Sequence, residues 1–336
     1  MGLDQPGFRY EFSPDSNFVL LAWRRISREE LTDNSLACMI LDRNLNVVHE
    51  AFSPFRRFDQ SVSLRKMYIL DSEHLLFTAQ TQSGGSAFQG PATISFGLLH
   101  YNVGESTTRV IGFTKSRQVP VELKILTNVP GKLIAAGWYL DQENERREAG
   151  VFIGEITRAD TLENLHLYTL SEAMRDALIR REKKSGAVAI RSSYQSELLA
   201  DPAGFTFVLH LRGLPDKGIE LHSPGSKTNN SLHVWRFDAD YQLISNTTTG
   251  FLNLGREEMM ETFSWQPILV NDKWYALASD YSQANNEAKP FGAATYAWDL
   301  SDYSFDLLLQ ESRKEFTVLA PRELIQTGKN EWVGIA

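Results

Sequence analysis

Short polar turns separate apolar runs along the whole chain, and one turn-centred pattern recurs. It occurs in FSPDSNFVLLAW, YILDSEHLLFTAQ, LTNVPGKLIAAGWY, LLADPAGFTFVLHL, LVNDKWYALASDY and LIQTGKNEWVGIA. These turns start at Asp15, Asp71, Pro130, Asp201, Asn271 and Thr327. Starts about 60 residues apart are typical of propellers and solenoids. Gly, Pro, Asp and Asn take tight-turn backbone angles at little cost, and the flanking runs have the composition of strands.

A second β run, polar turn and β run follows each of the first five turns, so one repeat predicts four antiparallel strands, A to D. Four such strands make one blade of a β-propeller. Blades pack radially on both sides, which explains why the strands are apolar on both faces. The predicted fold is therefore an all-β, single-domain β-propeller of about six blades over 1–336. The alternatives are a long β-sandwich or two unrelated β domains. The expected blades span 8–54, 61–113, 120–170, 192–249, 263–310 and, in part, 314–336.

Two features depart from a regular propeller. The sixth repeat stops after strand B, so either this blade is only a hairpin or the chain belongs to a longer polypeptide, which we favour. A partner chain that completes the last blade is a third option. The segment 171–186 predicts a one-helix insertion, because Ser171 suits an N-cap, Glu172 follows it and Gly186 ends the segment.

In such a meander the A–B and C–D turns lie at one end of each sheet, the turn end, and the B–C loops lie at the other, the loop end. The B–C loops are long and polar, and they span 24–34, 81–92, 140–150, 212–230 and 281–293. Long loops on a rigid scaffold often carry function, so we predict binding at the loop end. The B strands bring aromatic, amide, guanidinium and carboxylate groups there, which suit a carbohydrate or peptide ligand. The candidate residues are Trp23, Arg24, Gln80, Gln82, Trp138, Tyr139, Asp141, His210, Arg212, Asp280 and Tyr281.

No catalytic or metal-binding motif stands out in the sequence. The seven histidines are scattered singly over the repeats, which favours surface or hydrogen-bonded structural roles. Asp280 and Glu287 could act as an acid and base pair in glycosidic cleavage, but sequence does not give the separation that this chemistry needs. The segments 42–46 (DRNLN) and 238–242 (DADYQ) lack the features of a calcium loop and predict hairpin turns. We therefore expect no metal, no cofactor and no catalytic residue.

Composition narrows the classes of partner. A net charge of −8 argues against general nucleic-acid binding, which requires a basic surface. No apolar run approaches the length of a membrane-spanning helix. The single cysteine, Cys38, lies in an apolar run and predicts a small buried side chain with no disulfide.

The blades FSPDSNFVLLA, LDRNLNVVHEAF, LIAAGWYLDQENERREAGVFIGEI, LLADPAGFTFVLHLR and PILVNDKWYALASDY resemble a group of uncharacterised, exported propeller-like proteins of Bacteroidetes type. The resemblance implies a propeller in the periplasm or outside the cell, and it carries no catalytic residue. We therefore expect a non-enzymatic binding or scaffold propeller of the cell envelope or extracellular space, with a protein or carbohydrate ligand at the loop end. Two alternatives stay open: a carbohydrate- or peptide-directed hydrolase or lyase using the same end, and a subunit of a larger envelope assembly.

Overall fold

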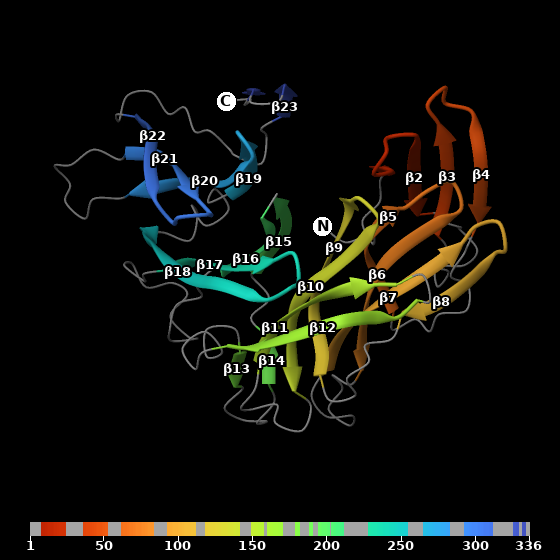
Figure 1. Cartoon of the computed structure of the whole chain (residues 1–336), viewed down its shortest axis with the longest axis horizontal. Helices are drawn as coiled ribbons and strands as arrows, with labels where there is room; N and C mark the ends of the chain where they lie inside the picture. Colours follow the sequence, from red (N-terminus) through yellow and green to blue (C-terminus); the bar gives the residue numbers. More distant parts are fainter. Residues whose placement is uncertain are drawn as a thin grey trace. The chain divides into compact units, whose positions relative to one another are not determined.

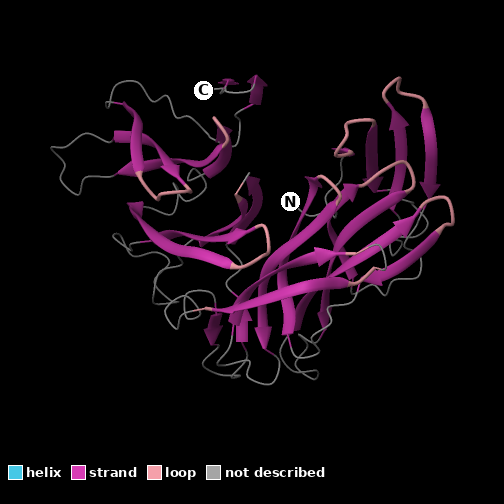
Figure 2. Ribbon diagram, viewed as in Figure 1, coloured by secondary structure: helices cyan, strands magenta, loops and turns pink. Residues whose placement is uncertain are grey.

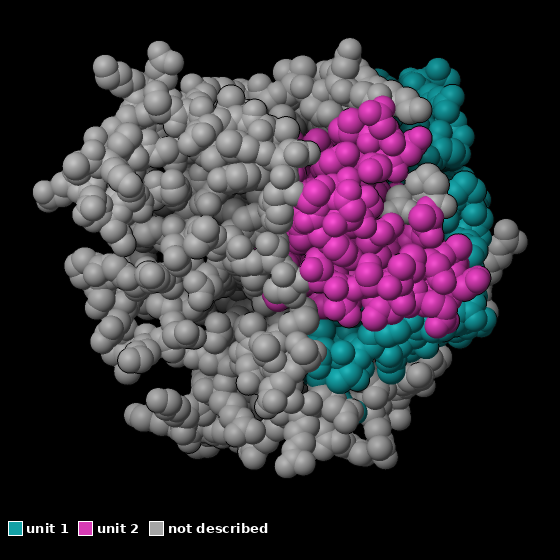
Figure 3. Space-filling view, turned by 60° about the vertical axis from the view of Figure 1, so that its left-hand side comes forward, with its two compact units in different colours: residues 1–190 teal, residues 191–336 magenta. Residues whose placement is uncertain are grey.

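The described residues of the computed structural model form strands and tight turns (Figure 2). The described residues are 8–24, 36–52, 62–83, 93–111, 118–141, 149–157, 160–170, 179–181, 188–190, 194–201, 203–211, 228–254, 265–282, 292–311, 325–328 and 331–333. The chain divides into two compact units, residues 1–190 and 191–336, whose described parts are coloured separately in Figure 3. Within the described residues, no helix is long and apolar enough to cross a membrane.

Unit 1 holds three four-stranded antiparallel sheets (Figure 1), each a meander whose strands pair in chain order. Sheet 1 consists of β1 (Phe8–Phe12), β2 (Phe18–Arg24), β3 (Leu36–Asp42) and β4 (Val47–Phe52). Sheet 2 consists of β5 (Val62–Ile69), β6 (His74–Ser83), β7 (Thr93–Asn102) and β8 (Thr107–Ile111). Sheet 3 consists of β9 (Gln118–Val129), β10 (Lys132–Asp141), β11 (Ala149–Ile156) and β12 (Leu162–Thr169). A two-stranded hairpin, β13 (Ile179–Arg181) with β14 (Val188–Ile190), follows them.

Unit 2 repeats the same plan twice. Sheet 4 consists of β15 (Tyr194–Asp201), β16 (Gly204–Leu211), β17 (Thr228–Asp238) and β18 (Leu243–Leu254). Sheet 5 consists of β19 (Trp265–Val270), β20 (Lys273–Ser282), β21 (Gly292–Asp299) and β22 (Phe305–Glu311). The sixth repeat is the two-stranded hairpin β23 (Ile325–Gly328) and β24 (Glu331–Val333).

The C–D hairpins close through a repeated side-chain cap. Asp42 Oδ1 accepts hydrogen bonds from the backbone N–H groups of Asn44 and Asn46, both at 2.8 Å. Asp238 Oδ1 accepts the equivalent pair from Asp240 and Gln242, at 2.9 and 2.8 Å. Leu45 closes the first of these turns at a φ of 63°, in the left-handed region. The segments 42–46 and 238–242 are therefore hairpin turns, as their sequences predict.

Apolar side chains on both faces of a sheet bury it between two neighbours. On one face of sheet 2, Leu75 and Phe77 pack with Leu20 of sheet 1. On the opposite face, Leu76 packs with Phe152 of sheet 3. Each of these side chains contributes about 1.5–3 kcal/mol when fully buried, so the stacking of sheets supplies most of the core.

Unit 2 packs its sheets in the same manner. Val208 and Val234 of sheet 4 share a buried cluster with Ala276 and Trp298 of sheet 5. The chain is thus an all-β protein built from the four-stranded sheets of a β-propeller with an incomplete sixth sheet, which confirms the predicted fold class.

The predicted helical insertion over 171–186 is wrong in the part that the structure describes. Ile179–Arg181 forms the strand β13, which pairs with β14, and the remaining residues of 171–186 lie outside the described ranges. Pairing between Ile179 and Ile190 outweighs the helical propensity of the described residues, and no helical pattern reveals this contact.

Gly137, in the middle of β10, allows a close approach between two strands. A Cβ atom at this position would lie 1.9 Å from the backbone oxygen of Glu122 and 3.0 Å from the Phe152 ring. Gly97 of β7 is a matched contrast, because a Cβ atom there would have no neighbour within 4 Å.

We predict that Gly137→Ala lowers the free energy of unfolding by about 1–3 kcal/mol, because a backbone atom must move to make room. Gly97→Ala is expected to be neutral or stabilising, since Ala restricts the unfolded chain more than Gly does. Urea denaturation of the two variants measures both effects. Equal stability of the two alanine variants would contradict the assigned packing of β9 on β10.

Candidate functional site

The last residues of β10 carry three of the predicted binding residues to the loop end of sheet 3. Trp138, Tyr139 and Asp141 are all buried, with Asp141 only 6 % exposed. Successive strand residues alternate between faces, so Tyr139 and Asp141 share one face and Trp138 lies on the other. Tyr139 belongs to the buried cluster between sheets 2 and 3, so the face shared with Asp141 is the one towards sheet 2. A buried carboxylate therefore lies two residues from an aromatic ring, at the end of β10.

Gly150 leaves room for the Tyr139 ring. The two residues are paired across β10 and β11, and a Cβ atom at position 150 would lie 2.4 Å from the Tyr139 ring and its hydroxyl. The glycine is therefore what lets the ring lie flat over β11, beside the strand end.

Sheet 4 has buried polar side chains in the loop-end half of its strands. His210 is fully buried on β16, in the row that pairs it with Gln195 and Leu232. The adjacent row, on the opposite face, holds Ser196 and His233, which are 1 % and 3 % exposed. Polar side chains are therefore buried on both faces of this half of the sheet.

The remaining predicted site residues stay untested by side-chain geometry. Trp23 is half-buried in β2. The strand positions whose side chains lie outside the described set are Arg24, Gln80, Gln82, Asp280 and Tyr281. Arg212, Glu287 and most of each B–C loop also lie outside the described residues. Of the predicted set, the structure places Tyr139 and Asp141 together and separates them from Trp138.

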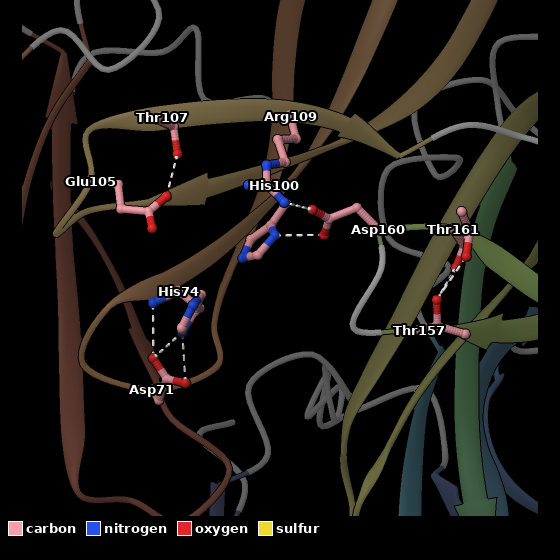
Figure 4. A network of polar contacts seen from close by, with 9 residues as sticks. All are labelled: Asp71, His74, His100, Glu105, Thr107, Arg109, Thr157, Asp160 and Thr161. Carbon is pink, nitrogen blue, oxygen red and sulfur yellow. Dashed lines mark hydrogen bonds and ion pairs between the residues drawn. The ribbon is translucent and has the colours of Figure 1, made fainter.

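A polar network that sequence reasoning missed lies at the turn end of sheets 2 and 3 (Figure 4). His100 Nδ1 on β7 lies 2.6 Å from Asp160 Oδ1, in the C–D turn of sheet 3. Arg109 lies 3.5 Å from the other oxygen of the same carboxylate. His74 Nδ1 lies 2.8 and 2.9 Å from the two oxygens of Asp71. Sequence shows only single histidines, whereas pairing of β6 with β7 brings the two rings to a centroid distance of 5.2 Å.

The turn end of unit 2 is also joined by polar contacts between sheets. Trp274 Nε1 of sheet 5 donates a hydrogen bond to the Ala200 carbonyl of sheet 4 at 2.6 Å. The Arg236 guanidinium of sheet 4 donates to the Ser301 carbonyl of sheet 5 at 2.9 Å. In both units, hydrogen bonds at the turn end therefore link neighbouring sheets.

Neither thiol chemistry nor a large metal cluster is visible in the described part of the chain. Burial raises the pKa of the Cys38 thiol to about 12, so the side chain stays protonated and acts as a small apolar group. Among the described residues, no three or more His, Cys, Asp or Glu side chains gather as metal ligands.

Comparison with known proteins shows remote likeness only. No protein family and no curated protein sequence matches the chain. The chain is similar in structure to an α-L-arabinanase of Cellvibrio cellulosa, at 12 % identity and a TM-score of 0.39, over 92 % of this chain and 96 % of that one. It is also similar to a thermostable family-43 glycoside hydrolase, at 8 % identity and a TM-score of 0.37, over 94 % of this chain and 96 % of that one. A third similar structure is the tricorn protease, at 9 % identity and a TM-score of 0.38, over 91 % of this chain and 27 % of the protease. Likeness at these scores assigns no activity to the chain.

His233 makes stability depend on pH. Burial lowers its pKa to about 4, because the interior of sheet 4 disfavours the charged ring. The unfolded chain binds the proton below its ordinary pKa of about 6.5, whereas the folded chain does so only near 4. The contribution of His233 is therefore fully present above about pH 6.5 and is lost as the pH falls towards 4.

We expect the free energy of unfolding of wild type to fall by about 3 kcal/mol between pH 6.5 and 4 because of His233. The variant His233→Gln should lack this fall. The free energy of unfolding of wild type and variant, measured by urea denaturation across this range, gives the difference directly. The variant loses stability at high pH through the changed side chain, but its difference from wild type shrinks as the pH falls. A difference that is constant with pH would contradict the assignment.

Proposed function

We propose that this chain is a non-enzymatic binding or scaffold protein that holds a carbohydrate or protein ligand at the loop end of its sheets. The observation that carries the proposal is the pair Tyr139 and Asp141, buried on one face at the end of β10. The Asp141 carboxylate lies where β10 ends, so it would accept hydrogen bonds from sugar hydroxyls or peptide N–H groups, and the buried Tyr139 ring would support the strand end beneath it.

The structural role of the carboxylates at the turn end supports this proposal. At the turn end, carboxylates cap their own hairpins, as Asp42 and Asp238 do, or fasten neighbouring sheets, as Asp160 does. These carboxylates are engaged within the chain. A scaffold fixed at one end leaves the long segments at the other end to vary with the ligand.

We propose a periplasmic or extracellular location, on the strength of the resemblance to exported propeller proteins of Bacteroidetes type. A second proposal for its role is that the chain is one subunit of an envelope assembly. Another chain would then complete the sixth sheet.

A hydrolase acting at the same end is the alternative, and the position of the Asp141 carboxyl at the loop end of β10 is the observation that favours it. Glycosidic cleavage requires a second carboxyl about 5–9 Å away.

The test compares retention of the purified chain on immobilised polysaccharides and on cross-linked envelope proteins, using wild type, Asp141→Asn and Asp240→Asn. Asp141→Asn keeps the shape of the side chain and removes the charge. We expect it to weaken retention about tenfold, the equivalent of about 1.4 kcal/mol. Asp240→Asn makes the same change at the turn end, and retention is expected to stay at the wild-type level.

Thermal unfolding of each variant shows whether the fold is kept. Equal retention of all three proteins on every ligand would overturn the proposed site. Release of reducing sugar or peptide by wild type, lost in Asp141→Asn, would establish the hydrolase instead.

A further inference from the structure

We propose that His74 and His100 form a binding site for a divalent late-transition-metal ion such as Zn²⁺, at the turn end of sheet 2. The two imidazoles would bind the ion through Nε2, and Asp71 and Asp160 would act behind them. This site is separate from the loop-end ligand site and does not depend on it.

Strand register places the two histidines on one face. His100 of β7 pairs with Leu76 of β6, and His74 lies two residues before Leu76 on the same strand. Residues two apart on a strand share a face, so His74 and His100 are diagonal neighbours across an antiparallel pair. The face is the one that packs towards sheet 3, because Leu76 belongs to the cluster shared with that sheet.

Each ring has the carboxylate neighbour at Nδ1 that is typical of a metal-bound histidine. Asp160 Oδ1 lies 2.6 Å from His100 Nδ1, and the Asp71 oxygens lie 2.8 and 2.9 Å from His74 Nδ1. A carboxylate next to Nδ1 keeps the proton on that nitrogen, so the lone pair lies on Nε2. Metal-ligating histidines have this carboxylate partner on the opposite nitrogen, which fixes the ring and raises its basicity.

The Nε2 atom of His100 is the position at which an ion would bind. The atom is buried and has no hydrogen-bond partner among the described residues. A buried polar atom without a partner is rare in folded proteins and calls for an explanation. An ion at this nitrogen would remove the cost of leaving it unpaired.

The spacing of the rings fits one ion. Their centroids lie 5.2 Å apart, and Figure 4 shows the pair with the carboxylates of Asp71 and Asp160 on its outer sides. Two imidazoles bound tetrahedrally to one zinc ion, with Zn–N of about 2.0–2.1 Å, have centroids about 5 Å apart. The two carboxylates outnumber the one guanidinium at the network, Arg109, so the local charge favours a cation.

The donor set selects the class of ion. Imidazole nitrogen suits Zn²⁺, Cu²⁺ and Ni²⁺, whereas Ca²⁺ and Mg²⁺ take oxygen ligands. The site has two direct protein ligands, because the carboxylates act through the histidines, and water completes the coordination. Such a site exchanges its ion with solution, unlike a closed structural zinc centre with four protein ligands.

The experiment titrates tag-free, metal-stripped protein with Zn²⁺ by calorimetry and with Co²⁺ by visible absorption. Wild type is compared with His74→Gln, Asp160→Asn and His166→Gln. His74 is the direct ligand to remove, because its side chain is 35 % exposed and its loss leaves the core intact. His166, on β12 next to Tyr168, is the matched control histidine away from the network.

We expect one ion per wild-type chain, with the wild-type affinity kept by His166→Gln. His74→Gln should weaken binding more than tenfold. Asp160→Asn removes the carboxylate that positions His100, so it should weaken binding about 10–100-fold. Zn²⁺ should also raise the unfolding temperature of wild type and not that of His74→Gln, because an ion bound only by the folded chain stabilises it. Absence of binding to wild type, or equal affinity of wild type and His74→Gln, would overturn the proposal.

Discussion

Face-to-face stacking of four-stranded sheets is the constraint on which the structure depends. A sheet with apolar side chains on both faces is stable only between two neighbours, and sheet 2 meets this condition with Leu75 and Phe77 on one side and Leu76 on the other. The same constraint explains the close approach at Gly137 and the flat Tyr139 ring over Gly150. Small residues are found where strands and rings must come close.

Stacking also decides where polar groups can be tolerated. Carboxylates at the turn end are satisfied by backbone N–H groups or by a residue of the next sheet, as Asp42 and Asp160 are. The polar side chains deep in sheet 4, His210 and His233, lie instead in the loop-end half of their strands.

The turn-end network and the loop-end residues of β10 lie at opposite ends of the sheets. At the turn end, the contact between His100 and Asp160 joins sheets 2 and 3, and His74 lies beside His100. At the loop end, Tyr139 and Asp141 lie at the exit of a strand into a long polar segment. The first site depends on which strands pair, and the second on where strands end.

The sequence by itself determined the strands, the turns and the all-β class, because these follow from local alternation and from turn residues such as Asp15, Asp71 and Asn271. It also located the hairpin turns at 42–46 and 238–242, whose caps join residues only two and four positions apart. Only the tertiary structure decided that Ile179–Arg181 is a strand. It also decided that Trp138 and Tyr139 lie on opposite faces of a buried sheet. The contact between His100 and Asp160 likewise appears only in the folded chain. These features depend on register and on which face meets which neighbour, and such long-range contacts leave no periodic mark on a single sequence.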